Sequence, residues 1–420
     1  MPSTSRGDRG GSLNRLDEIY GPTVIKAQGL PGPAFTNEGL FQEEARRVFH
    51  RSWCCIGLRQ DVAELNQLSP IEFLGQPLLL VHNQNGIEVF HNVCSHRGAV
   101  LVSRARAAAR NLPIVCPYHS WTYALDGTLL RTPHAGGAGV HDDAAIDRSA
   151  CGLKKVRSAL WNGLIFVNLS GDAVPFEQFI APLAQRTDFL NGGRLCHDAA
   201  FSRSAAPKAN WKILIENFVE SYHLPPVHRD LQRVNPMASH YQILGGASYV
   251  GQGGDGRDWQ KTGGEHDLPA RPPGRFHQVS EYEVFWLYPN LIFQPVGNMC
   301  FVIILFPQTV SLTHERIEFF FYAEDALDDK YAAERQRQVD FIVQVNTEDV
   351  GICERVHAGR RSDGFTGGIF CLRQEKSSLR VQQIVASHML CDSGSIAPSI
   401  EFSFEDIHHP EEDQPTVGAS

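Results

Sequence analysis

The stretch from Cys94 to Tyr123 constrains the fold more than any other part of the chain. It contains a Cys-x-His pair, Cys94 and His96, and a Cys-x-x-His pair, Cys116 and His119, with nineteen residues between the pairs. Thiolates bind soft metals and imidazoles bind borderline ones. The four side chains therefore suit either a tetrahedral zinc ion or a 2Fe-2S cluster in which two histidines replace two cysteines on one iron. Either group requires that two loops meet in the folded chain.

The residues around the two pairs favour the cluster. Only one residue separates Cys94 from His96, and Gly98 follows, which suits a shared cluster edge better than the wrapping of one ion. The stretch resembles the Rieske family, whose pattern is C-x-H-R-G, a spacer, then C-P-Y-H-x-W-x-Y. The matching residues are Cys94, His96, Arg97, Gly98, Cys116, Pro117, Tyr118, His119, Trp121 and Tyr123. This resemblance implies a 2Fe-2S cluster on Cys94, His96, Cys116 and His119, with a zinc site and four unrelated side chains as the alternatives.

The composition indicates an ordinary globular protein with room for two or three domains, since 42% of its 420 residues are hydrophobic and 20% are charged. A net charge of -9 indicates neither a nucleic-acid nor an anionic-membrane partner. No apolar run approaches a membrane span, and the N-terminus lacks the apolar core of a signal peptide, so we expect a cytoplasmic protein. The ten cysteines follow no regular framework, and no disulfides are expected.

Changes of pattern along the chain predict an all-β domain followed by an α+β domain. The first domain shows short apolar runs broken by Gly, Pro and Asn, with a hairpin turn at Asn85-Gly86. The second alternates helical stretches with apolar strands. The predicted divisions are a flexible segment over 1–37, a first helix over 38–52, the β-domain over 53–170, the second domain over 171–395 and a disordered tail over 396–420.

A second group of metal-binding side chains lies within residues 210–230. On a predicted helix, Glu220 and His223 are neighbours. Two prolines separate His223 from His228, and they break the helix so that the second imidazole can turn back toward the first. Two converging imidazoles are two thirds of a 2-His-1-carboxylate site for Fe(II). A His-x4-His pair alone is more often an ordinary surface or core feature, but its place downstream of the cluster motif favours iron.

A candidate for the missing carboxylate is Asp349. It lies in the middle of the apolar face that recurs through residues 339–356. A buried carboxylate needs a partner, which iron would supply. The alternative is that Asp349 pairs with an arginine or caps a neighbouring helix. Glu348 and Glu354 fall off this face and are expected to be solvated charges.

Together these motifs resemble the oxygenase (alpha) components of the Rieske non-heme iron oxygenases. The resemblance implies an α+β fold, in which an N-terminal Rieske domain precedes a helix-grip catalytic domain whose antiparallel sheet wraps around helices. It implies that His223, His228 and Asp349 hold Fe(II), and that Glu220 bridges the cluster of one subunit to the iron of the next. It also implies a head-to-tail ring, in this family usually a homotrimer.

The resemblance further implies the reaction. A flavin and iron-sulfur reductase would deliver electrons from NAD(P)H, and O2 would be the cosubstrate. Aromatic dioxygenases of the family generally have Asp where this chain has Glu220, whereas the carnitine, glycine betaine and choline monooxygenases have the longer side chain. We therefore expect monooxygenation or oxidative demethylation of a small quaternary ammonium compound. Hydroxylation or dihydroxylation of an aromatic acid is the alternative, and a non-catalytic Rieske electron carrier is a remote one.

The substrate-binding residues are predicted only loosely. Tyr282, Trp286 and Phe293 are candidates for a cation cage or an aromatic slot, although strand aromatics usually belong to the core. The Gly- and Pro-rich residues 244–275 are predicted to form a mobile loop, either a lid or a plain surface insertion.

Overall fold

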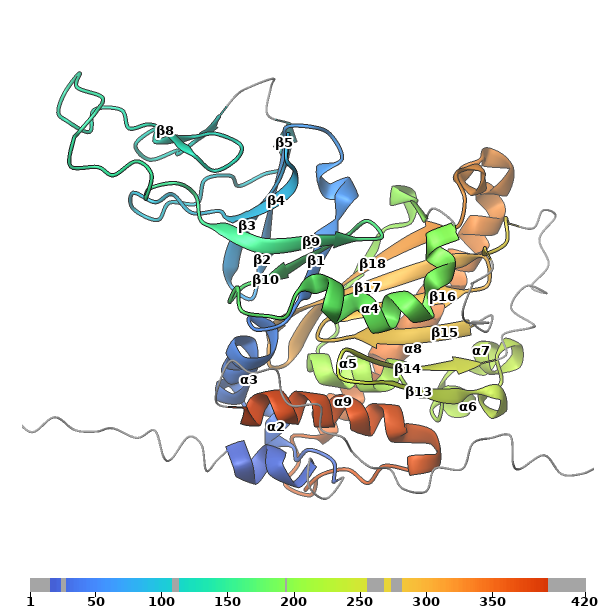
Figure 1. The fold of residues 1–420 in the computed structure, drawn as a ribbon. Helices are drawn as coiled ribbons and strands as arrows, with labels where there is room; N and C mark the ends of the chain where they lie inside the picture. The colour runs from blue at the N-terminus through green and yellow to red at the C-terminus, as the bar shows by residue number, and fades with distance from the viewer. Residues whose placement is uncertain are drawn as a thin grey trace, which may run out of the picture.

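The computed structural model describes residues 16–23, 28–107, 113–192, 195–254, 268–272 and 282–391 (Figure 1). Two antiparallel β-structures succeed one another along the chain, and helices cover the second. No helix in the described ranges is long and apolar enough to cross a membrane. None of the ten cysteines, all of which lie in the described ranges, forms a disulfide, as the sequence predicts.

The first domain is built on a seven-stranded antiparallel sheet in the order β1-β10-β9-β4-β3-β2-β5. The strands are β1 Cys54–Leu58, β2 Gln67–Phe73, β3 Gln76–Asn83, β4 Gly86–His91, β5 Arg106–Ala107, β9 Lys155–Trp161 and β10 Leu164–Asn168. The predicted hairpin is confirmed, because Asn83 pairs with Gly86 across the β3–β4 turn. A smaller sheet follows β5 and consists of β6 Ile114–Val115, β7 Thr122–Tyr123 and β8 Leu129–Arg131.

The second domain is built on an eight-stranded antiparallel sheet in the order β11-β18-β17-β16-β15-β14-β13, with β12 pairing beside β18. Its strands are β11 Cys196–His197, β12 Arg203–Ala205, β13 Tyr241–Gly245, β14 Tyr249–Gly254, β15 Tyr282–Leu287, β16 Leu291–Val296, β17 Met299–Thr309 and β18 Leu312–Phe321. Side chains alternate between the two faces of each strand, so two apolar cores form, one on each side of the sheet.

Helices cover the sheet on both sides (Figure 1). One core joins it to α5 Trp211–Phe218, α8 Ala332–Gly359 and α9 Leu372–Leu390. The other core joins it to α4 Phe176–Arg186 and to strands β1 and β10 of the first domain. The remaining helices include α2 Pro33–Thr36, α3 Glu38–Glu44, the π-helical turn Ala45–Phe49, α6 Leu224–Val227 and α7 Arg229–Val234. The sheet and helices expected of the α+β fold are thus present.

A polar junction locks the two domains together. Arg316 on β18 donates to both carboxylate oxygens of Asp61 in the first domain, each at 2.7 Å, and its Nε lies 2.5 Å from Glu318. Nearby, the buried side chain of Asn290 accepts from the backbone of Cys55 at 2.9 Å and donates back to it at 2.7 Å. These paired contacts fix the position of β1 against the second sheet.

Two predictions about flexible segments are wrong for the residues that the structure describes. Within 1–37, residues 16–23 form a helix whose Tyr20 is fully buried and donates to Glu44 at 3.1 Å. Within 244–275, residues 249–254 are the fully buried strand β14. The glycines there reflect tight packing rather than a loop, because a side chain at Gly251 would collide with the carbonyl of Val284 on the next strand. Most of the remaining segment and the predicted tail over 396–420 lie outside the described residues.

Candidate metal sites and substrate pocket

The first candidate site lies on two similar turns of the small domain. In one, Gly98 donates its N–H to the carbonyl of Cys94, and in the other Ser120 donates to Cys116. Gly98 has a φ of +74°, which explains the glycine of the motif, since this left-handed conformation is costly for other residues. The turns follow β4 and β6, and they bring the two Cys/His pairs to one end of the domain.

The thiols of this site point inward and the imidazoles outward. Cys94 and Cys116 are each only 2% exposed, whereas His96 is exposed and its ring centroid lies 4.8 Å from that of His119. Trp121 stacks on His96 at 4.7 Å between ring centroids. This separation of sulfur and nitrogen donors fits a cluster with one buried all-sulfur end and one histidine end at the surface.

Tyr123 supports the buried end. Its hydroxyl lies 3.1 Å from the sulfur of Cys94 and 2.9 Å from the hydroxyl of Ser95. Burial and the neighbouring Cys94 raise the pKa of the Tyr123 phenol. The phenol therefore stays protonated and can donate to a cluster sulfur. The buried Nδ1 of His119 has no hydrogen-bond partner, as expected of an atom reserved for a metal.

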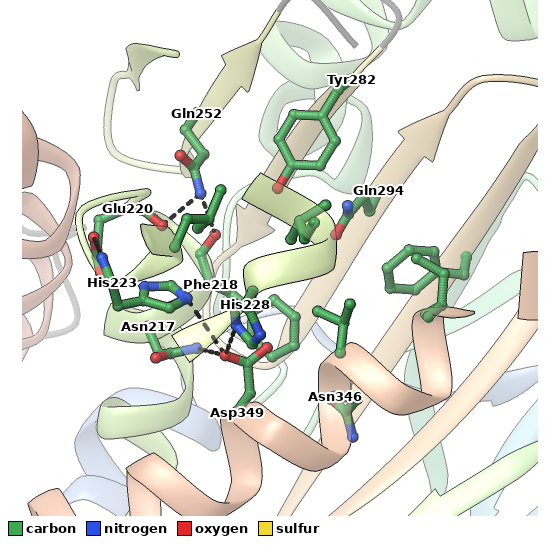
Figure 2. Close-up of a pocket in the computed structure, with 15 residues that line it drawn as sticks. Asn217, Phe218, Glu220, His223, His228, Gln252, Tyr282, Gln294, Asn346 and Asp349 are labelled. Atoms are coloured by element: carbon green, nitrogen blue, oxygen red, sulfur yellow. Dashed lines mark hydrogen bonds and ion pairs between the residues drawn. The ribbon is translucent and has the colours of Figure 1, made fainter. Parts of the chain in front are cut away.

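The second candidate site is assembled from two distant segments. His223 and His228 flank the short helix α6, and Asp349 projects from the middle of α8 (Figure 2). One ligand atom from each of the three lies within 4.8 Å of the others. The Nε2 atom of His228 is 2.8 Å from Asp349 Oδ1, and that of His223 is 3.4 Å from the same oxygen. Their convergence fits a facial 2-His-1-carboxylate iron site.

Each of these side chains is oriented by a second polar group. Glu220 Oε1 lies 2.5 Å from His223 Nδ1, and Glu348 Oε2 lies 2.7 Å from His228 Nδ1. Asn217 donates to Asp349 at 2.6 Å. Such partners fix the tautomer and leave Nε2 of each imidazole free for a metal.

The electrostatics of this site also favour a cation. Burial lowers the pKa of His223, but the carboxylates of Asp349 and Glu220 raise it to about 10 in the absence of a metal. Burial opposes the charge of Asp349, yet its hydrogen bonds to both imidazoles lower its pKa. A divalent ion would replace these protons as the partner of the carboxylate.

The structure corrects two steps of the sequence interpretation. Helix α5 ends at Phe218, so Glu220 and His223 meet through a turn rather than across a helix face. Glu348 is more than a solvated charge: its side chain is 34% exposed, but its carboxylate holds His228. Glu354 accepts a hydrogen bond from the backbone of Lys208. The position of Glu348 next to Asp349 in the sequence could have indicated this role. A metal-binding histidine commonly donates the N–H of its other ring nitrogen to a carboxylate.

A pocket opens beside the three candidate ligands. It is lined by Asn217, Phe218, Glu220, His223, Leu224, His228, Leu231, Gln252, Tyr282, Gln294, Phe301, Ile342, Val345, Asn346 and Asp349 (Figure 2). Its wall is apolar apart from the metal site and a few amides. Gln252 donates to the carbonyls of Phe218 and Glu220, at 3.1 and 2.7 Å, and so anchors the turn that carries Glu220.

Only one of the three aromatic candidates lines this pocket. Tyr282 does, but Phe293 faces the opposite side of the sheet and packs on Trp161. Trp286 shares the face of Tyr282 but lies four residues further along β15, where its indole donates to Pro289. Phe301, another aromatic residue of the predicted sheet, also lines the pocket, as does Phe218, which the prediction did not include. Strand alternation decides the face, but register decides which residue reaches the pocket.

A buried ion pair supports the segment that carries the histidines. Lys212 on α5 and Glu44 on α3 are both inaccessible to solvent and lie 2.6 Å apart. Glu44 also accepts from the indole of Trp211 at 2.9 Å and from Tyr20. The pair joins the N-terminal helices to α5, and so fixes the start of the helix whose end leads to Glu220.

Comparison with known proteins identifies two domain families in the chain. Residues 52–143 match the Rieske 2Fe-2S domain family, and residues 197–390 match the family described as the ring hydroxylating alpha subunit (catalytic domain). The carnitine monooxygenase oxygenase subunit of Escherichia coli (strain K12) is 27% identical over 361 residues, covering 84% of this chain and 89% of that protein. Putrescine 2-hydroxylase of Ralstonia nicotianae is 29% identical over 354 residues, covering 79% and 86%.

A solved structure shares the fold. The crystal structure of a quaternary ammonium Rieske monooxygenase with an inhibitor aligns with a TM-score of 0.71 at 22% identity, covering 89% of this chain and 98% of that one. The two family matches divide the chain as the geometry does, with a cluster domain before an iron domain. The cofactors are therefore a 2Fe-2S Rieske cluster and a mononuclear iron, and the chain belongs to the Rieske non-heme iron oxygenases as an oxygenase (alpha) component.

Proposed function

We propose that this chain is the terminal oxygenase of a system that monooxygenates or oxidatively demethylates a small quaternary ammonium compound. In this proposal Cys94, His96, Cys116 and His119 hold the cluster, and His223, His228 and Asp349 hold the iron. When bound, the cluster supplies electrons singly and the iron activates O2 next to the substrate. A reductase that contains flavin and an iron-sulfur centre supplies the electrons from NAD(P)H.

The aromatic lining of the pocket is the observation that carries the substrate class. Phe218, Tyr282 and Phe301 line the space beside the iron ligands. Aromatic faces attract a methylated ammonium group, which has no N–H to donate and is weakly solvated. Among relatives, an oxygenase subunit named for carnitine aligns with 84% of the chain, and a putrescine hydroxylase also acts on an amine. The longer side chain at Glu220 agrees with this branch of the family.

The residues of the site have distinct tasks. Apolar side chains of α8, including Ile342 and Val345, exclude water from one side of the reacting space. Asn217 holds the carboxylate of Asp349, while Glu220 and Glu348 hold the imidazoles. These contacts keep the three ligands on one face, so that the remaining space stays open to O2 and substrate.

Turnover with isotopically labelled O2 tests the substrate class. The protein, loaded with both metals and supplied with a reductase and NADH, is given quaternary ammonium compounds and small aromatic acids in turn. We expect one oxygen atom of O2 in an aldehyde, formaldehyde or hydroxylated ammonium product. Products derived only from aromatic acids would replace the proposal with ring hydroxylation.

The proposal extends to a head-to-tail ring, usually a trimer in this family. Figure 1 shows β8 and the loops near it at the far end of the first domain from α6 and α8, which carry the second site. Glu220, which lines that site and contacts His223, is then the bridge to the cluster of the partner subunit. The open imidazole end of the cluster site is suited to such a contact.

Mixed oligomers test this arrangement. Cys94→Ser removes a cluster ligand and Asp349→Ala removes an iron ligand, so each variant alone should be inactive. Coexpressed chains should regain activity if the cluster of one chain serves the iron of its neighbour. Mixed rings of confirmed composition that stay inactive would show that both centres must lie in the same chain.

A further inference from the structure

Glu315 is a buried carboxylate that the proposed reaction leaves without a role. It lies on β18 with 2% of its surface exposed, on the side of the sheet that faces α8. Its carboxylate accepts a hydrogen bond from Asn346 Nδ2 at 3.1 Å. No lysine, arginine or histidine among the described residues forms an ion pair with it. The adjacent Arg316 points to the other face of the sheet, where it binds Asp61.

An unpaired buried carboxylate is costly, so the fold retains it at the expense of stability. Burial raises the pKa of Glu315 to about 7, although the hydrogen bond from Asn346 acts in the opposite direction. Replacement by an apolar residue would remove that cost. A carboxylate in such a position would be stabilised by a cation that arrives only with a ligand.

Asn346 connects this carboxylate to the substrate pocket. It lies on α8 one turn before Asp349 and lines the pocket (Figure 2). Only 6% of Asn346 is exposed, and its Oδ1 has no hydrogen-bond partner. Because Nδ2 binds Glu315, the oxygen forms the opposite, negative end of the amide dipole. A buried acceptor without a donor beside a ligand pocket points to a positively polarised group of the ligand.

We infer that Asn346 and Glu315 together form the counter-charge for the substrate cation, with the amide of Asn346 carrying the negative potential of Glu315 into the pocket. This inference rests on the proposed function and names the residues that select its substrate. Glu315 would act through Asn346 without touching the ligand and is therefore a positioning and specificity residue. The aromatic residues would supply shape and cation–π contact, while the pair would distinguish a cation from a neutral molecule of the same shape.

Paired ligands of equal shape test the assignment. Choline has a positively charged quaternary nitrogen where 3,3-dimethylbutan-1-ol has a neutral quaternary carbon. Their affinities can be measured by calorimetry under anaerobic conditions on protein that holds both metals. We expect the native chain to prefer choline. Glu315→Gln, which keeps the shape and removes the charge, should weaken choline binding about tenfold and change binding of the alcohol less than about twofold.

Two further variants separate charge from structure. Glu315→Asp retains the carboxylate and should keep most of the preference for choline. Glu318→Gln removes another buried carboxylate from the same strand, but on the opposite face, and should leave both affinities unchanged. Iron and cluster content are measured in each variant, because Glu315 lies within electrostatic reach of Asp349.

The outcomes are decisive. A native chain without preference for choline, equal weakening of both ligands in Glu315→Gln, or no weakening at all would overturn the assignment. Loss of iron in Glu315→Gln would likewise overturn it, since Glu315 would then serve the metal. The assay contains no O2 and no reductase, so it is independent of turnover. Choline binding that depends on Glu315, in a protein that oxidises none of the quaternary ammonium compounds, would contradict the proposed function alone.

Discussion

The candidate cluster ligands lie at one end of the small domain on two short turns, whereas the candidate iron ligands lie in the second domain on segments more than a hundred residues apart. In the first site the imidazoles reach the surface and the thiols are buried. In the second, His228 and Asp349 are buried beneath a pocket, 1% and 5% exposed. The candidate cluster site is therefore accessible to another protein surface, whereas the candidate iron site is suited to enclose a small molecule.

The two sites also differ in how they are held. Backbone turns fix the cluster ligands, with Tyr123 as the main side-chain support. The candidate iron ligands depend on side chains, because Glu220, Glu348 and Asn217 each hold one of them. A point change should therefore disturb the second site gradually through its supports, but the first mainly through its ligands.

Removal of a ligand should have the largest effect and should separate the two sites. Asp349→Ala deprives the iron of its only anionic ligand in the proposed set. We expect loss of the mononuclear iron and at least about a hundredfold loss of turnover, while the Rieske absorption is retained. Metal analysis and visible spectra give both readouts. Glu354→Ala, on the same helix, is the control, and loss of the cluster together with the iron would refute the independence of the sites.

Glu220→Ala should break the link between the sites. It removes the side chain that orients His223 and that we assign to the contact with the partner subunit. With excess iron, both metals should remain bound, but reoxidation of the reduced cluster by O2 and substrate should slow by about a hundredfold. Stopped-flow absorbance measures the rate. Undiminished single-turnover activity would contradict the role of Glu220, and Glu220→Asp should retain part of the rate.

Glu348→Gln tests the graded support of the second site. The amide can still contact His228, but it cannot stabilise the imidazole as a carboxylate does. Iron affinity should fall about tenfold, with the cluster unchanged. Competition with a chelator measures the change, and Glu354→Gln serves as the matched control. Equal affinities in all three proteins would mean that Glu348 does not contribute to iron binding.

Arg316→Leu should weaken the docking of the two domains. It removes the partner of Asp61 and one partner of Glu318, and the Arg316 side chain is 28% exposed. We expect a loss of about 2 kcal/mol in the free energy of unfolding, while metal contents stay normal. Urea denaturation provides the measurement. Adding Asp61→Asn to the Arg316→Leu variant should restore part of the lost free energy of unfolding, because it removes the carboxylate charge that has lost its partner.

The smallest effect concerns pH. Burial raises the pKa of Glu318, but hydrogen bonds from His197 and Ser202 and the charge of Arg316 lower it below its ordinary value of 4.5. The ionised carboxylate thus stabilises the fold above about pH 4.5, and this contribution is lost as the pH falls through the lower folded-state pKa. Glu318→Gln should therefore be about 1 kcal/mol less stable near pH 7 and approach the native protein in acid. A constant difference across that range would exclude this linkage.

The sequence predicted the two sites unequally. The cluster ligands and Gly98 form a contiguous motif whose spacing reflects two local turns, so their proximity could be inferred. The meeting of His228 with Asp349 depends on how α8 packs, and only the periodic burial of its face indicated it. The prediction for Glu348 as a solvated charge missed its contact with His228. Glu348 is adjacent to Asp349 on the helix, and its side chain can still contact the Nδ1 edge of that imidazole.

The substrate wall was the least predictable part. Tyr282, Trp286 and Phe293 are all strand aromatics, and their types do not reveal strand register or which face meets the helices. The structure places Tyr282 in the pocket and Trp286 further along the same face of the sheet. Phe293 lies on the opposite face. Similarly, Glu315 carries no sequence signal, because its isolation results from burial against α8.

The most direct test of the account is a single turnover without a reductase. The protein is loaded with both metals, reduced under anaerobic conditions and mixed with O2, with and without each quaternary ammonium candidate. We predict that the reduced cluster is reoxidised rapidly only when such a cation is present, and that an oxygenated or demethylated product appears in proportion. Reoxidation that is independent of the cation, or that is stimulated only by aromatic acids, would contradict the proposed coupling between the two sites and the assigned substrate.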